Sequence, residues 1–302
     1  MRAAEAISTG LSAAWRAKWL VVIFLACQLV IAAEVGAPMY TALVEHIGKS
    51  AVGNELAHGF SSAWLLEFQI AYQGFLRGFS IAIVYAGVLF LLLHTVLSAG
   101  AFEVFTRGEG AKLHAFGRGV GKYFLRFFRL MVIASVYYFL CFWIFQDLGG
   151  RGLDWAFRDS VHEAPHFYLD WLRWALLVFS VVVVSMVIEY AKADMVRDDH
   201  ASALAALGHG AGFVFSHFGR ALTIYLGLGA LGGVAVVVYS LFALYFPQSS
   251  AGTVFVWFVV AQVLMCFRWM FRLASWAAEV AFYGSHAHTE LAGEPAAVDV
   301  PA

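Results

Sequence analysis

Residues 221–246 read ALTIYLGLGALGGVAVVVYSLFALYF, a run of 26 residues without Asp, Glu, Lys or Arg. An α-helix rises about 1.5 Å per residue, so about 20 apolar residues cross the ~30 Å hydrocarbon core of a bilayer. The run is continuously apolar rather than alternating, which favours a helix over a strand of a membrane barrel. Residues 221–246 are therefore predicted to form a transmembrane helix.

Five further stretches have the same length and apolar character. Together the six stretches predict an all-α, polytopic membrane helix bundle. The predicted transmembrane helices lie near residues 19–40, 80–101, 123–145, 171–190, 221–246 and 253–283. They form a single predicted membrane domain over residues 1–284, in which the first span is retained rather than cleaved as a signal peptide. The remaining residues, 285–302, are predicted to be a disordered cytoplasmic tail.

The composition indicates a lipid environment and excludes several classes of protein. Of the 302 residues, 62% are hydrophobic and 13% are charged, and the mean hydropathy is +0.77. Soluble domains average about 45–50% apolar and about 25% charged residues. The chain is therefore neither a soluble enzyme nor a disordered protein, and its net charge of −1 does not attract nucleic acid. The three cysteines lie in apolar runs and fit neither a disulfide framework nor a zinc site: Cys27, Cys141 and Cys266.

Positively charged residues indicate the orientation of the spans. Twelve Lys and Arg residues fall on one side of the predicted bundle and five on the other. Cytoplasmic segments carry the excess of Lys and Arg, so both termini are predicted to be cytoplasmic. Two interfacial amphipathic helices are also expected. One covers residues 61–79 on the outer side, or extends the second span, and the other covers 199–218 on the cytoplasmic side with Asp198 or Asp199 as its cap.

Ionisable residues inside the predicted spans are the first functional candidates, because each costs about 2.5–3.5 kcal/mol to insert. They are Glu34, His94, Glu103, Glu189, Arg268, Arg272 and Glu279. The helical rise places Glu189, Arg268 and His94 in the inner leaflet, and Arg272 follows Arg268 by about one turn. Two interpretations are open. These residues form a substrate or proton site, or Glu189 and Arg268 form a structural ion pair.

Four basic residues follow the helical repeat where the chain enters the third span. Arg118, Lys122, Arg126 and Arg129 are spaced by four, four and three residues, so they share one helix face. A stripe of this kind suits an anionic lipid head group. The alternative is the ordinary excess of positive charge in cytoplasmic segments.

Residues 162–166 read HEAPH and match the pattern H-E-x-x-H, in which two His bind zinc and the Glu acts as general base. Pro165 is incompatible with the interior of such a helix and favours a helix start at this point. His162 then lies outside the helix and does not share a face with His166. The sequence therefore predicts neither a metal nor a cofactor, with His162, Glu163 and His166 as the residues of a zinc alternative.

Two stretches carry a family resemblance. They are YFLRFFRL at residues 123–130 and EYAKADMVRDDHASAL at residues 189–204. Together they resemble uncharacterised six-span inner-membrane proteins of bacteria, and they are loosely similar to the membrane domain of some glycerophosphodiester phosphodiesterases. The catalytic barrel of those enzymes is absent here, so the resemblance implies no catalytic residue. It implies a location in the bacterial inner membrane.

Three functions are compatible with these observations. The favoured one is a non-catalytic integral membrane protein, either a lipid-interacting component or an accessory subunit of a membrane assembly. Gly229 and Gly233 have the spacing of close helix packing and predict self-association or contact with a partner subunit. The second is a small-solute transporter or channel that uses the charged residues of the inner leaflet. The third is a zinc-dependent hydrolase on the outer loop.

Overall fold

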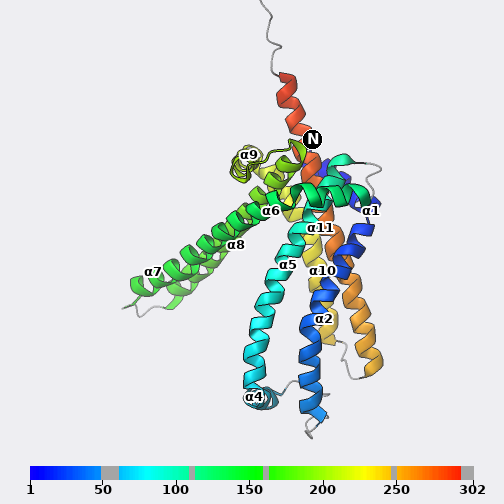
Figure 1. Cartoon of the computed structure of the whole chain (residues 1–302). Helices are drawn as coiled ribbons and strands as arrows, with labels where there is room; N and C mark the ends of the chain where they lie inside the picture. The colour runs from blue at the N-terminus through cyan, green and yellow to red at the C-terminus, as the bar shows by residue number, and fades with distance from the viewer. Residues whose placement is uncertain (49–60, 109–112, 159–162, 246–249, 294–302) are drawn as a thin grey trace, which may run out of the picture. The chain divides into compact units, whose positions relative to one another are not determined.

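The computed structural model describes residues 1–48, 61–108, 113–158, 163–245 and 250–293 (Figure 1). Within these ranges the chain is helical and has no strand, which confirms the predicted all-α class. The helices are α1 (Ala3–Arg16), α2 (Trp19–Gly48), α4 (Ser62–Ala71), α5 (Gln73–Arg107), α6 (Leu113–Phe142), the π-helix η1 (Trp143–Leu148), α7 (Gly149–Ala156), α8 (Glu163–Arg197), α9 (Ala203–Ser216), α10 (Phe218–Tyr245) and α11 (Ala251–Gly293).

Six helical segments are long and apolar enough to cross a membrane, as the sequence predicts. They are Trp19–Gly48, Gln73–Arg107, Leu113–Ala156, Pro165–Arg197, Phe218–Tyr245 and Gly252–His286. Only 6–17% of the residues in their apolar windows are buried within the protein, so most of these side chains face outward. Such a surface needs a lipid solvent, and the chain is therefore a multi-pass membrane protein.

The chain divides into two compact units, where the sequence predicts one domain. The first unit contains residues 1–13, 98–227 and 275–302, and the second contains residues 14–97 and 228–274. Helices α1, α5, α10 and α11 each contribute residues to both units.

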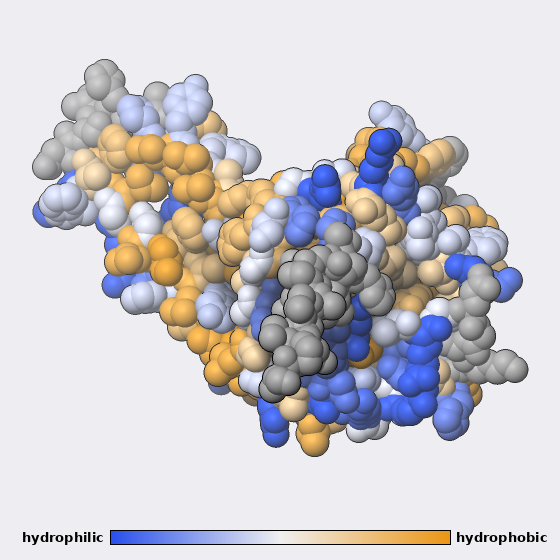
Figure 2. Space-filling model, turned by 90° about the horizontal axis from the view of Figure 1, so that it is seen from above, coloured by the Kyte–Doolittle hydropathy of each residue, from blue (hydrophilic) through white to orange (hydrophobic). Residues whose placement is uncertain are grey.

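In the first unit, α6 and α8 lie side by side as a helical hairpin (Figure 1). The π-helix η1 and the short α7 continue directly from α6. Helix α8 begins at Glu163, two residues before the predicted start at Pro165. Proline is tolerated in a first turn, because the N–H groups there have no intrahelical partner. Figure 2 shows hydrophobic residues, in orange, along much of this hairpin toward the left of the view.

The first unit also contains a packed core in which α5, α6, α8 and α11 meet. The rings of Phe102, Phe127 and Trp276 are fully buried, with centroids 5.8 Å apart for Phe102–Phe127 and 5.5 Å apart for Phe102–Trp276. Helix α6 approaches α5 closely at Gly119, where an added Cβ would lie 2.6 Å from the Glu103 Cβ. Large aromatic rings bury much apolar area, so this core contributes strongly to stability.

Helix α9 occupies the stretch in which a cytoplasmic interfacial helix over 199–218 is predicted. It begins later than predicted because Ser202, and not Asp198 or Asp199, is its N-cap, with a hydroxyl that accepts a hydrogen bond from the Ala205 N–H. One face of α9 packs against α8. The approach is closest at Gly210, where an added Cβ would lie 2.8 Å from the backbone nitrogen of Ala191.

In the second unit, α4 and the start of α5 occupy the other predicted interfacial stretch, 61–79. The helix is interrupted at Tyr72, so residues 62–71 form a separate helix and residues 73–79 extend the second span. Elsewhere in this unit, Trp269 of α11 packs against Phe24 of α2 with ring centroids 4.7 Å apart. The Trp269 indole N–H donates a hydrogen bond to Gln28 Oε1 at 2.7 Å.

Helix α11 continues to Gly293, which places the first nine residues of the predicted disordered tail in a helix. Residues 294–302 lie outside the described ranges. An added Cβ at Gly229 or Gly233 would meet no atom within 4 Å, so neither glycine mediates close packing within the described part of the chain. Self-association through these two glycines stays a prediction.

The close approach of α9 to α8 generates a stability prediction. We expect Gly210→Ala to destabilise the protein by about 1–3 kcal/mol, because the new methyl group overlaps the α8 backbone. At Gly208 and Gly212 an added Cβ meets no atom within 4 Å. Gly208→Ala and Gly212→Ala are therefore matched controls that should raise stability by up to about 1 kcal/mol through helix propensity. Thermal unfolding in detergent measures all three, and equal shifts would contradict the close contact.

Candidate functional site

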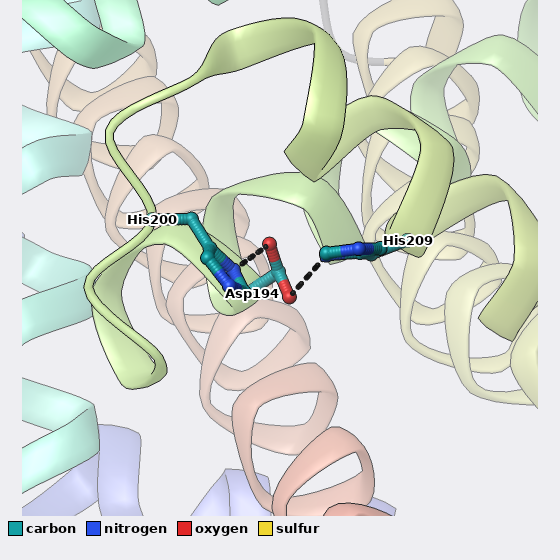
Figure 3. A group of neighbouring side chains, drawn as sticks. All are labelled: Asp194, His200 and His209. Carbon is teal, nitrogen blue, oxygen red and sulfur yellow. Dashed lines mark hydrogen bonds and ion pairs between the residues drawn. The ribbon is translucent and has the colours of Figure 1, made fainter.

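A buried carboxylate at the end of α8 forms the centre of the candidate site. Asp194 is only 1% exposed, and two histidines flank it (Figure 3). His200 Nδ1 lies 2.9 Å from Asp194 Oδ2, and His209 Nδ1 lies 3.4 Å from Asp194 Oδ1. The ring centroids of the two imidazoles are 4.9 Å apart. Each histidine therefore faces a different oxygen of the same carboxylate.

The three side chains come from a helix, a turn and a second helix. Asp194 lies in the last turn of α8, and His209 lies in the middle of α9, which runs back along α8. His200 belongs to the turn between these helices, residues 198–202, which we call the α8–α9 turn. Asp199 in this turn has a φ of 56°, a left-handed conformation that Asp adopts more readily than most residues. This conformation reverses the chain and leaves His200 beside Asp194.

Two cations of α6 hold the α8–α9 turn. Lys122 Nζ donates a hydrogen bond to Asp199 Oδ2 at 2.9 Å, and Arg126 Nη1 lies 2.7 Å from Asp199 Oδ1. Hydrogen bonds from Lys122, and then from Arg126, lower the pKa of the Asp199 carboxyl. Asp199 is therefore ionised at neutral pH and joins the turn to α6.

Helix α11 contributes a further contact of the buried carboxylate. The Tyr283 hydroxyl donates a hydrogen bond to Asp194 Oδ1 at 2.7 Å and lies 3.3 Å from Asp198 Oδ2. A buried ionised carboxylate is costly unless hydrogen bonds or cations compensate its lost hydration. Here the Tyr283 hydroxyl of α11 and the imidazoles of the α8–α9 turn and α9 converge on Asp194, and this convergence explains how it is tolerated.

The donor set of this group is one that transition-metal ions accept, and its ligand atoms lie close enough for small side-chain shifts to bring them around one ion. One carboxylate oxygen and one nitrogen from each imidazole all lie within 4.8 Å of one another. In a tetrahedral zinc site, with ligand bonds of about 2.0–2.1 Å, neighbouring ligand atoms are roughly 3.3 Å apart. Two imidazoles and one carboxylate favour ions such as Zn²⁺ or Co²⁺ over Mg²⁺ or Ca²⁺, and three ligands leave a fourth position open. The Tyr283 hydroxyl would orient the carboxylate, as outer-shell donors do in metal proteins.

The ionisable residues predicted inside the spans lie in both units. Glu189 in the first unit is 2% exposed and accepts a hydrogen bond from the Trp276 indole N–H at 3.4 Å. Arg268, Arg272 and His94 belong to the second unit, where the His94 ring lies 6.2 Å from the Trp269 ring. A Glu189–Arg268 pair would join the two units, and it stays a prediction.

The remaining acidic candidates inside the predicted spans include two that are buried in the first unit. Glu103 lies between Arg107 and Arg118, at 2.6 Å and 3.4 Å respectively. Glu279 accepts a hydrogen bond from the Ser275 hydroxyl at 2.9 Å. Both carboxylates are therefore held by neighbouring side chains of the same unit.

Three of the four residues in the predicted basic stripe contact carboxylates of the chain itself. Arg118 pairs with Glu103, and Lys122 and Arg126 both pair with Asp199. Arg129 is exposed on α6, and it forms no hydrogen bond or ion pair with another described residue. The stripe therefore connects α6 to α5 and to the α8–α9 turn, and its binding of an anionic lipid head group stays a prediction.

The residues of the zinc alternative on the outer loop are only partly described. His162 lies outside the described residues, and Glu163 is the first residue of α8. His166 Nε2 lies 3.5 Å from Asp154 Oδ1 of α7. The part of this motif that the structure describes thus contributes an imidazole–carboxylate contact between α7 and α8.

Sequence reasoning missed Asp194, His200 and His209 as a group. They are separated by six and nine positions, which is not the spacing of one helix face. The available signal was a histidine just after a helix end and a second histidine in the next helix. This signal becomes informative only when the return path of α9 is known.

No protein-family model, curated protein or solved structure matches the chain.

The contact between α11 and the buried carboxylate generates a second stability prediction. Tyr283→Phe removes the hydroxyl that donates to Asp194 and also lies near Asp198, so we expect a loss of about 1–3 kcal/mol. Tyr245→Phe is the matched control, because Tyr245 is 79% exposed. Thermal unfolding of both variants in detergent checks the prediction, and a neutral Tyr283→Phe would show that Asp194 does not need this donor.

Proposed function

We propose that the protein is a non-catalytic, multi-pass membrane protein that binds a divalent transition-metal ion through Asp194, His200 and His209. The observation that carries this proposal is the convergence of a buried carboxylate and two imidazoles within 4.8 Å. Exposure supports it as well. The side chains of His200 and His209 are 39% and 53% exposed, so an ion in solution can reach the imidazoles although Asp194 is buried.

The proposed location is the cytoplasmic membrane of a bacterium, with both termini and the α8–α9 turn on the cytoplasmic side. The excess of Lys and Arg on that side of the six spans supports this orientation. In this orientation the metal site is accessible to metal ions in the cytoplasm. A bound ion would join α8, the α8–α9 turn and α9.

Metal titration tests the proposal directly. We expect untagged, metal-stripped protein in mild detergent to bind one equivalent of Co²⁺, with visible absorption of tetrahedral coordination, and to bind Zn²⁺ in competition. Bound metal should also raise the unfolding temperature, because it binds the folded state in preference. His200→Gln and His209→Gln should each weaken binding at least about tenfold, since each removes a ligand.

A control for this titration uses another exposed histidine. His114 lies near the start of α6, outside the proposed site, and His114→Gln should leave the affinity unchanged. The double variant His200→Gln/His209→Gln measures any metal held elsewhere, such as on the histidines near the C-terminal end. If the original protein binds no more tightly than this double variant, the proposed function is wrong.

The proposed orientation has its own test. In a background with Cys27, Cys141 and Cys266 replaced, we expect Asp154→Cys on α7 to react with a membrane-impermeant maleimide in intact cells. Thr9→Cys on α1 should react only after the cells are permeabilised, because it lies on the cytoplasmic side. The opposite labelling pattern would place the metal site outside the cytoplasm.

A further inference from the structure

The two imidazoles of the proposed metal site are held in different ways. His209 belongs to α9, a regular helix whose approach to α8 is set by the close contact at Gly210. His200 belongs to the α8–α9 turn, where no helical hydrogen bonds fix its backbone. The position of the His200 imidazole against Asp194 therefore depends on the contacts that fix the α8–α9 turn.

Arg126 provides that support from α6. Its Nη1 lies 2.7 Å from Asp199 Oδ1, 3.0 Å from the Asp199 carbonyl oxygen and 3.2 Å from the His200 carbonyl oxygen. It thus contacts the backbone of both residues at the reversal of the chain. The guanidinium also lies over the Tyr123 ring, 5.4 Å from its centroid, and the Tyr123 hydroxyl donates a hydrogen bond to the Val196 carbonyl at 3.3 Å. Arg126 is therefore itself oriented by a buried side chain.

We infer that Arg126 is a positioning residue of the metal site, which holds the His200 imidazole against Asp194 by fixing the α8–α9 turn. The inference rests on the proposed function. It assigns a new role to one member of the basic stripe. Arg126 contacts no ligand atom and acts through the backbone of His200.

An electrostatic role and a positioning role of Arg126 predict opposite changes in metal affinity when this residue is replaced. Arg126 is a cation near a site for a cation, so removal of its charge alone would tighten metal binding. Loss of the turn geometry would weaken metal binding, because His200 no longer lies where Asp194 and His209 hold the ion. The sign of the change in affinity therefore distinguishes a positioning role from an electrostatic one.

The experiment measures Co²⁺ affinity in the full chain. We expect Arg126→Gln to weaken binding about 10–100-fold, the range found when outer-shell partners of metal ligands are removed. Arg126→Lys keeps the charge but not the planar group that contacts three oxygens, and it should weaken binding as well. Arg129→Gln is the matched control. Arg129 is exposed on the same helix, one turn after Arg126, and the loss of its charge should not weaken binding.

A double variant shows whether the effect passes through His200. If Arg126 acts by positioning this imidazole, Arg126→Gln should add almost nothing in a His200→Gln background. A full additional loss there would overturn the inference. Unchanged or tighter Co²⁺ binding by Arg126→Gln in the otherwise native protein would overturn it too.

Amide hydrogen exchange of the metal-free protein tests whether Arg126 holds the α8–α9 turn, independently of whether the protein binds metal. We expect Arg126→Gln and Arg126→Lys to accelerate exchange in residues 198–202 while residues 206–212 of α9 stay as protected as in the native protein. Failure of the native protein to bind Co²⁺ would refute the proposed function, and the exchange result would still decide whether Arg126 holds the turn. Unchanged exchange in residues 198–202 would overturn the inference.

Discussion

The burial of the Asp194 carboxylate is the constraint around which one end of the first unit is arranged. An ionised carboxylate removed from water costs several kcal/mol unless donors or cations replace its hydration. No single helix provides enough of them. The chain reverses after α8, returns as α9 and places His200 and His209 on the two oxygens, while α11 contributes the Tyr283 hydroxyl. Removing any of these elements would leave a buried charge without part of its compensation.

Lipid imposes the second constraint, and it explains which part of the fold was predictable. A bilayer leaves the backbone no hydrogen-bond partners outside the helix, so long apolar runs identify helices directly. All six predicted spans are present as helices long and apolar enough to cross a membrane. Their ends were less predictable, because apolar composition does not distinguish lipid contact from protein contact. On α8, Val178 lies within the predicted span 171–190 and is 59% exposed, whereas Met195 lies beyond its predicted end and is fully buried. Both are apolar residues, so the sequence alone does not separate them.

The candidate site was not predictable in the same way, because it depends on a chain reversal rather than on a repeat. Helical periodicity relates residues three or four positions apart, whereas Asp194, His200 and His209 belong to two helices and a turn. Their meeting requires a left-handed Asp199 and a glycine at position 210, and neither requirement is visible as a pattern. The cap illustrates the same difficulty. Asp198, Asp199 and Ser202 are all good N-caps in isolation, and only the path of the turn selects Ser202.

The basic stripe shows why charge periodicity alone does not identify a partner. A row of cations on one helix face serves three purposes equally well: retention on the cytoplasmic side, attraction of anionic lipid, and pairing with acids of neighbouring elements. In this chain Arg118 pairs with Glu103, and Lys122 and Arg126 pair with Asp199, so the third purpose accounts for most of the stripe. The two pairs with Asp199 involve partly exposed side chains, and exposed pairs contribute little to stability on their own. Their importance therefore lies in geometry, because a weak pair that fixes a short turn determines where a neighbouring imidazole lies.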